Sequence, residues 1–126
     1  MHLPTIVIVE DDGEMRDVLR IFLERDGFRT IEFESATRAH DEIELQAFDA
    51  VILDKEMPGI DGLDFLAYLH GRFPDVPVIL MTAFGGSAVA EAAFARGAAR
   101  YLEKPFPMNG VVSAVRLAIA AAKGEA

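Results

Sequence analysis

Five short apolar runs alternate with longer amphipathic stretches, and this alternation constrains the fold more than any other feature of the chain. The apolar runs, which predict strands, are residues 5–9, 28–33, 50–53, 76–81 and 99–102. Helices are predicted between and after them, at residues 14–26, 35–45, 63–71, 87–97 and 109–123. Strands separated by helices form a parallel sheet with helices on both faces, joined by right-handed crossovers. The sequence therefore predicts a single α/β domain, (βα)5, over residues 1–126.

Local signals set the expected ends and faces of several helices. Ser35 and Ser87 are predicted to cap helices, and Gly27 is a predicted C-terminal stop. In the first helix, four apolar residues at helical spacing predict an inward face: Met15, Val18, Leu19 and Phe22.

The composition excludes several classes of function. The 126 residues contain 21 acidic and 12 basic side chains, giving a net charge of −9, and no cysteine. Direct nucleic-acid binding is not expected, because phosphate backbones require clustered Lys and Arg. Disulfides and thiolate metal sites are excluded. No signal peptide or apolar stretch of membrane-spanning length is recognised, so a cytoplasmic location without a membrane partner is expected.

Chemically useful residues follow four of the five predicted strands. They are three acids after the first strand, one after the third, a hydroxyl after the fourth and an ammonium after the fifth: Glu10, Asp11 and Asp12; Asp54; Thr82; and Lys104. In open parallel sheets, ligands bind outside the carboxyl ends of the strands, where the strand order switches. Glu34 follows the second strand and is expected at a sheet edge, away from the others.

Taken singly, each of these residues has a simpler interpretation. The acidic run could be a solvated turn with an Asp helix cap, and Asp54 could belong to an exposed charge cluster with Lys55 and Glu56. Thr82 could cap a helix and Lys104 could point into solvent. Their placement at four strand ends favours a shared site, because independent accidents would have to coincide at one rim.

The chemistry of such a site is specific. Clustered carboxylates repel one another and need a cation, and hard oxygen ligands favour Mg²⁺ or a similar ion. Lys104 can neutralise phosphoryl oxygens as a point charge, and the Thr82 hydroxyl can donate to one of them. One carboxylate can then act as the nucleophile and form an aspartyl phosphate.

Four motifs, in this order and spacing, resemble response-regulator receiver domains over about residues 4–122. The motifs are residues 6–12 (IVIVEDD), 54–62 (DKEMPGIDG), 81–83 (MTA) and 101–106 (YLEKPF). The resemblance implies a flavodoxin-like, doubly wound parallel sheet with strand order 2-1-3-4-5. It also implies that Asp54 accepts a phosphoryl group from a histidine kinase or a histidine phosphotransfer protein.

The same resemblance assigns a Mg²⁺ site. Asp11 would bind the ion directly and Glu10 through water, and the set is completed by Asp54 and the backbone carbonyl of Glu56. Asp12 is a further candidate acid, one position beyond this set.

The resemblance also assigns the residues that respond to phosphorylation. Thr82 and Lys104 would hold the phosphoryl oxygens, and Tyr101 would be the switch residue, its ring turning inward when Thr82 engages phosphate. Pro105 would follow a cis peptide bond. The surface around the fourth helix, fifth strand and fifth helix would then change. The downstream partner is unknown, and homodimerisation on phosphorylation stays open.

Two other functions are compatible with parts of the pattern. Haloacid-dehalogenase-like phosphatases also use an aspartyl phosphate, Mg²⁺, a Thr and a Lys, but their nucleophile lies on the first strand and the candidate here follows the third. A receiver-like interaction module that is never phosphorylated is the second alternative, although such modules usually lose a site residue. The preferred interpretation is a signalling domain that catalyses only its own phosphorylation and dephosphorylation.

In the receiver geometry that the resemblance implies, the side chains two positions after Asp54 and Thr82 would flank the path of a water that hydrolyses the acyl phosphate. Phe84 is bulky and cannot bind water, so it is predicted to slow the attack. Glu56 could position the water, or it could repel phosphate and compete for Mg²⁺, and the sequence does not decide between these roles.

Overall fold

The computed structural model describes residues 3–124, and five strands form one parallel sheet in the order β2-β1-β3-β4-β5. The strands are β1 (Thr5–Val9), β2 (Arg29–Phe33), β3 (Ala50–Asp54), β4 (Val78–Thr82) and β5 (Arg100–Glu103). The fold class and the strand order expected from the sequence are both confirmed. Because β1 and β3 are neighbours, the strand order switches between them.

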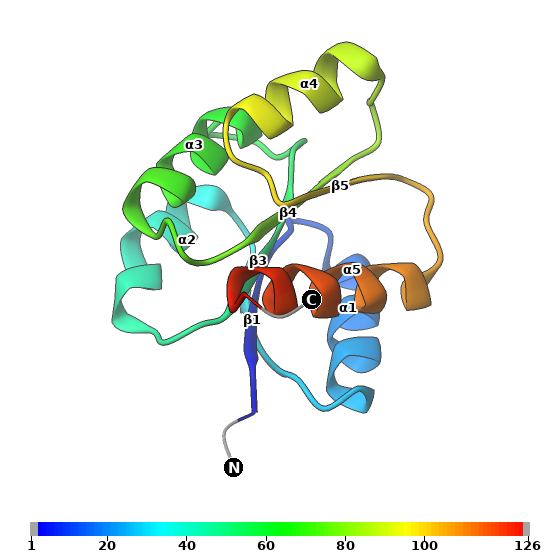
Figure 1. Ribbon diagram of the computed structural model, residues 1–126. Coiled ribbons are helices and arrows are strands. Elements are labelled where there is room, and N and C mark those ends of the chain that lie inside the picture. The colour runs from blue at the N-terminus through cyan, green and yellow to red at the C-terminus, as the bar shows by residue number, and fades with distance from the viewer. Residues whose placement is uncertain (1–2, 125–126) are drawn as a thin grey trace.

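Helices cover both faces of the sheet. They are α1 (Gly13–Arg25), α2 (Ala36–Glu42) with a following 3-10 turn (Ile43–Leu45), α3 (Gly62–Arg72), α4 (Ser87–Ala95) and α5 (Met108–Ala122). Figure 1 shows α1 and α5 together on one side of the strands, with α2, α3 and α4 on the other. Within residues 3–124, no helix is both long and apolar enough to cross a bilayer.

The pleat of the central strands divides the core into two halves. Every residue of β1, β3 and β4 is buried, as expected for strands covered by helices on both faces. Alternate residues contribute to different clusters because successive side chains point to opposite faces. In β1, Val7 and Val9 pack in the cluster that includes α2 and α3, while Ile6 and Ile8 pack in the cluster that includes α1 and α5.

The helix caps agree with the sequence at two positions and differ at a third. The Ser35 side chain accepts a hydrogen bond from the Arg38 N–H, and Gly27 follows α1 with a positive φ of 90°, both as expected. Ser87 is not a cap, because α4 begins at Ser87 itself after Gly86, which has a φ of 118°. The start of α4 is therefore set by the glycine loop and its contacts, and not by a capping hydroxyl.

The buried face of α1 is rotated relative to the prediction. Leu19 and Leu23 are buried and Met15 packs beside them, whereas Val18 is 38% exposed. The spacing of this face is i, i+4, i+8, and its cluster also contains side chains of α5. Packing against α5 therefore determines which face of α1 points inward, and the spacing of apolar residues within α1 carries no information on that packing.

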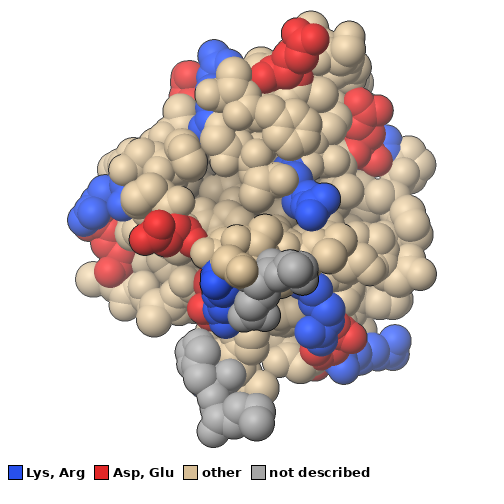
Figure 2. All heavy atoms as spheres, viewed as in Figure 1, with Lys and Arg blue, Asp and Glu red and all other residues tan. Residues whose placement is uncertain are grey.

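Charged side chains of both signs lie on the face drawn in Figure 2. On the face drawn in Figure 2, Lys and Arg side chains are interspersed with Asp and Glu rather than gathered into one broad basic patch.

Candidate functional site

Pairing between the two central strands brings two buried acids together. Val9 of β1 is the register partner of Leu53 of β3, and the residues that come next in the sequence are Glu10 and Asp54. Glu10 is 1% exposed and Asp54 is 2% exposed. Asp11 lies beside them and is exposed, and one carboxylate oxygen from each of the three residues lies within 4.8 Å of the others.

Lys104 supplies the opposing positive charge. Its Nζ lies 3.1 Å from Glu10 Oε1 and 3.3 Å from Asp54 Oδ1. The Lys104 N–H donates to the Thr82 carbonyl at 2.8 Å, which extends the β4–β5 pairing by one residue and fixes the lysine backbone at the rim. Burial alone would lower the pKa of Lys104, but its hydrogen bond and ion pair with Glu10, followed by Asp54, raise that pKa overall.

The acids have an unbalanced charge that a divalent ion would offset. Burial, followed by the hydrogen bond and charge of Asp54, raises the pKa of Glu10 to about 7. The buried carboxylates of Glu10 and Asp54 share the single ammonium group of Lys104. Asp11 is exposed, so the cluster is open to water on that side. Hard oxygen donors beside open solvent suit Mg²⁺, which keeps several waters when bound to protein. The donor set therefore fits a Mg²⁺ ion.

The start of α1 holds the acidic run in place. The Asp12 side chain accepts from the Glu14 N–H at 3.0 Å and is the N-cap of α1, while the Asp12 N–H donates to Glu10 Oε2 at 3.2 Å. Asp12 therefore has the capping role named above as the simpler interpretation, and a metal role for it stays a prediction. Arg16 donates to the Glu10 carbonyl at 2.7 Å. Sequence reasoning missed this contact, which has no signature beyond a basic residue early in α1.

Thr82 and Glu56 connect the end of β4 to the loop after β3. The buried Thr82 hydroxyl donates to Glu56 Oε2 at 2.5 Å, and the Ala83 N–H donates to Glu56 Oε1 at 2.7 Å. The Glu56 N–H in turn donates to Asp54 Oδ1 at 3.3 Å. The sequence predicts an effect of Glu56 on a water or a metal, but it carries no signal for the contact between Glu56 and Thr82.

The carboxylate of Glu103 binds Tyr101 and the loop after β4. The Tyr101 hydroxyl donates to Glu103 Oε2 at 2.8 Å, and the Gly86 N–H donates to the same oxygen at 2.9 Å. The Gly86 N–H, followed by the tyrosine hydroxyl, lowers the pKa of Glu103. Tyr101 is partly exposed, and Phe84 in the intervening loop is 73% exposed. The predicted cis peptide before Pro105 is present.

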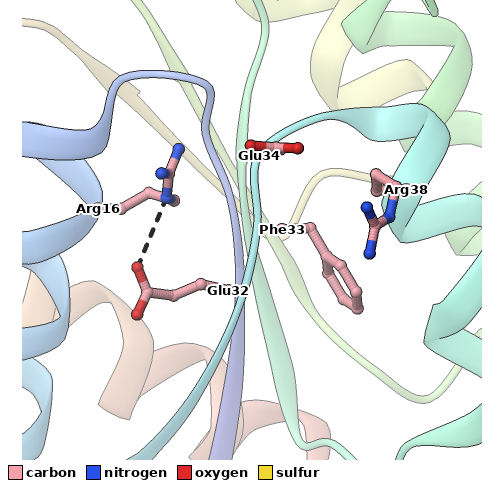
Figure 3. Close-up of a pocket in the computed structure, with 5 residues that line it drawn as sticks. All are labelled: Arg16, Glu32, Phe33, Glu34 and Arg38. Carbon is pink, nitrogen blue, oxygen red and sulfur yellow. Dashed lines mark ion pairs between the residues drawn. The ribbon is translucent and has the colours of Figure 1, made fainter.

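A separate hollow lies at the edge of the sheet, where β2 ends. Figure 3 shows its lining, in which Arg16 is paired with Glu32 at 3.6 Å: Arg16, Glu32, Phe33, Glu34 and Arg38. Glu34 lies here and not with Glu10 and Asp54, as its place after an edge strand predicted. The hollow mixes two basic and two acidic side chains and presents no matching set of metal or phosphate ligands.

The parallel sheet in the order β2-β1-β3-β4-β5 defines a flavodoxin-like α/β domain, and it carries a lysine-paired acidic cluster at the switch in strand order. A family model for the response regulator receiver domain matches residues 6–116. The chain therefore belongs to the response regulator receiver domain family, as its motifs indicated.

Similarity to individual proteins agrees with this assignment. The chain is 38% identical over 110 residues to the response regulator protein FleR of Pseudomonas aeruginosa, covering 87% of this chain and 23% of that protein. It is 35% identical over 125 residues to the transcriptional regulatory protein FixJ of Bradyrhizobium diazoefficiens, covering 96% of this chain and 61% of that protein. The chain thus spans less than two-thirds of the length of these relatives.

Solved structures share the fold closely. A CheY-like receiver domain protein from Methanospirillum hungatei has a TM-score of 0.92 at 22% identity, covering 99% of this chain and all of that one. NtrX from Brucella abortus, solved in complex with ADP, has a TM-score of 0.89 at 28% identity, covering 97% of this chain and 28% of that one.

Proposed function

We propose that this receiver domain accepts a phosphoryl group on Asp54 from the phosphohistidine of a histidine kinase or histidine phosphotransfer protein. The observation that carries the proposal is the arrangement around Asp54, which is buried on a central strand, paired with Lys104 at 3.3 Å and clustered with Glu10 and Asp11. Family membership supports it, since receiver domains of response regulators accept phosphoryl groups from histidine kinases.

The transfer balances as a displacement at phosphorus. A carboxylate oxygen of Asp54 attacks the phosphorus atom, and the phosphorus–nitrogen bond of the phosphohistidine breaks. The imidazole nitrogen leaves with the electron pair, and the product is an acyl phosphate on Asp54. Return to the starting state needs a water, whose oxygen attacks phosphorus while the bond to Asp54 oxygen breaks, releasing inorganic phosphate.

Charge compensation is what the remaining residues contribute. Lys104 lies beside Asp54 and would pair with a phosphoryl oxygen, and the Thr82 hydroxyl would donate to another. Such preorganised charges and donors commonly account for much of the acceleration of phosphoryl transfer. Glu10, Asp11, Asp54 and the Glu56 carbonyl would hold Mg²⁺, which would neutralise phosphoryl oxygens when bound.

The output of the domain would be a shift in the populations of the conformations that the β4–α4 loop and β5 adopt. The loop contacts Thr82 through the Phe84 N–H, and its Gly86 N–H shares the Glu103 carboxylate with Tyr101, so engagement of Thr82 by phosphate would change the contacts of Tyr101. The surface of α4, β5 and α5 is the expected site of change for an output domain or partner protein. A cytoplasmic location forms part of the same proposal.

Intact mass spectrometry after incubation with acetyl phosphate and Mg²⁺ tests the proposal. The wild type should gain the mass of one phosphoryl group and Asp54→Asn should gain none. The matched control is Asp61→Asn, which retains an N-cap for α3 and should be phosphorylated like the wild type. An unmodified wild type would favour the receiver-like module that is never phosphorylated, and rapid turnover of a generic phosphomonoester would favour the phosphatase.

A further inference from the structure

The Glu56 carboxylate occupies two adjacent donors at the end of β4. One of its oxygens accepts from the Thr82 hydroxyl at 2.5 Å, and the other accepts from the Ala83 N–H at 2.7 Å. An anionic oxygen pair that bridges a hydroxyl and a backbone N–H offers the same acceptor chemistry as two oxygens of a phosphoryl group. Glu56 is thus bound where an anionic group close to Asp54 would find its donors.

The contacts of Thr82 leave no spare donor. A threonine hydroxyl has one proton to donate, and Thr82 gives it to Glu56. Its oxygen also accepts from the Phe84 N–H at 3.0 Å, which ties the loop to the same hydroxyl. Because Thr82 is fully buried, solvent does not offer its hydroxyl a second arrangement. A phosphoryl oxygen can therefore reach the Thr82 proton only after Glu56 has released it.

Glu56 is linked to the nucleophile as well as to the donors. Its N–H donates to Asp54 Oδ1 at 3.3 Å, and Lys55 Nζ lies 3.5 Å from Glu56 Oε2. The backbone contact holds residue 56 next to Asp54, while the side chain can move by rotation about its own bonds. The carboxylate can therefore leave the donors without movement of the strand that carries Asp54.

We propose that Glu56 acts as an internal substitute for the phosphoryl group. Its carboxylate holds Thr82 and Ala83 while Asp54 is unmodified, and it is displaced when a phosphoryl group arrives. This inference rests on the proposed phosphorylation of Asp54. It gives Glu56 a positioning role that lowers the affinity of the site for phosphoryl oxygens, since hydrogen bonds to a charged acceptor must first be broken.

Titration with beryllium trifluoride in excess Mg²⁺ tests the competition at equilibrium. This anion is a stable mimic of a phosphoryl group bound to a carboxylate. Glu56→Ala removes the competing acceptor, and Glu56→Gln keeps its shape without the charge. We expect about tenfold tighter binding for Glu56→Ala and a smaller gain for Glu56→Gln. The control is Glu34→Gln, which removes a rim carboxylate that lies in the hollow at β2, away from Thr82, and should leave affinity unchanged.

The outcomes separate this inference from the proposed function. Tighter binding by the Glu56 variants alone, together with a changed Ala83 amide resonance in the free variants, supports the substitution. Unchanged or weaker binding by both variants, with normal phosphorylation of the wild type, overturns the role of Glu56 and leaves Asp54 as the acceptor. If Glu56→Ala does not fold, Glu56→Gln alone decides in the same way. Failure of the wild type to bind the anion or accept phosphate overturns both.

Discussion

The two sides of the candidate site are built differently. The acid side consists of Glu10 and Asp11, which follow β1, and Asp54, which ends β3. The pairing of those strands holds its two buried carboxylates side by side. The donor side, which is residues 82–86 with Tyr101, is held by the carboxylates of Glu56 and Glu103. Strand register cannot change without unfolding the sheet, whereas hydrogen bonds to side chains can be exchanged. The acid side is therefore suited to chemistry, and the donor side to a response.

The β4–α4 loop shows how the donor side is held. Gly86 has a φ of 118°, a conformation that other residues rarely adopt, and its N–H donates to Glu103. A side chain at Gly85 would collide with Glu103 and Tyr101. The loop thus lies close against β5 at one end and against Glu56 at the other. Loss of either carboxylate contact should release it.

The largest expected effect comes from Lys104, which pairs with the acid side and adjoins the donor side through its backbone. Lys104→Met removes the only cation paired with Asp54 among residues 3–124, so phosphorylation by acetyl phosphate should slow by about 100-fold. A time course of intact mass measures the rate. Lys123→Met, at the exposed end of α5, should react at the wild-type rate, and a similar loss there would point to a general charge effect.

The start of α3 lies so close to the loop after Asp54 that an added methyl group should not be tolerated there. A Cβ at Gly62 would lie 2.5 Å from Lys55 Cα and 2.6 Å from its carbonyl oxygen, both backbone atoms. Gly62→Ala should lower the free energy of unfolding by about 2 kcal/mol through overpacking. Gly71→Ala, also in α3 but with nothing within 4 Å of the added atom, should raise it by about 0.5 kcal/mol. Urea denaturation of both variants compares them, and equal effects would contradict the close approach.

Variants of the two acids that follow Glu10 should separate metal binding from helix capping. Asp11→Ala removes an exposed carboxylate of the cluster and should weaken Mg²⁺ binding about tenfold, with little effect on folding. Asp12→Asn retains an N-cap acceptor for α1 and should change Mg²⁺ affinity by about twofold or less. Isothermal titration with Mg²⁺ distinguishes them. A larger loss for Asp12→Asn than for Asp11→Ala would mean that the ligand set is assigned to the wrong acid.

The smallest effect is expected from Glu103, whose carboxylate is exposed. Glu103→Gln weakens the acceptor shared by Tyr101 and Gly86, so amide hydrogen exchange at Gly86 should quicken by about threefold. The amides of β1 and β3 should not change, because the acid side does not depend on this contact. Faster exchange in β3 as well would mean that the two sides are not held independently.

The acid side could be predicted from the sequence, and the contacts of the donor side could not. The apolar run before Glu10 and the one before Asp54 predict buried strands, and in a parallel sheet their carboxyl ends must meet at one edge. The hydrogen bond of Thr82 with Glu56 joins residues 26 positions apart, one at the end of β4 and the other in the loop after β3, and their approach depends on the packed sheet. Motif spacing predicts that Thr82 is a phosphate ligand, but it carries no information on which group Thr82 contacts in the unmodified protein.

The same limit explains the errors in the helices. Ser87 has the right chemistry for a cap, yet Gly86, whose N–H donates to Glu103 of β5, occupies the cap position. Val18 has the right spacing for the core, yet α1 directs Leu19 and Leu23 toward α5 and leaves Val18 exposed. Local patterns predicted where helices occur, while tertiary neighbours decided their caps and faces.

Chemical location of the phosphoryl group tests the central claim most directly. Borohydride reduces an acyl phosphate to an alcohol, so treatment of the phosphorylated protein should convert the modified aspartate to homoserine, which peptide mass spectrometry can locate. The strand geometry predicts homoserine at position 54 and unmodified residues at positions 10, 11, 12 and 56. Reduction at one of those other acids, with Asp54 intact, would contradict the assignment of Asp54 as the phosphoryl acceptor.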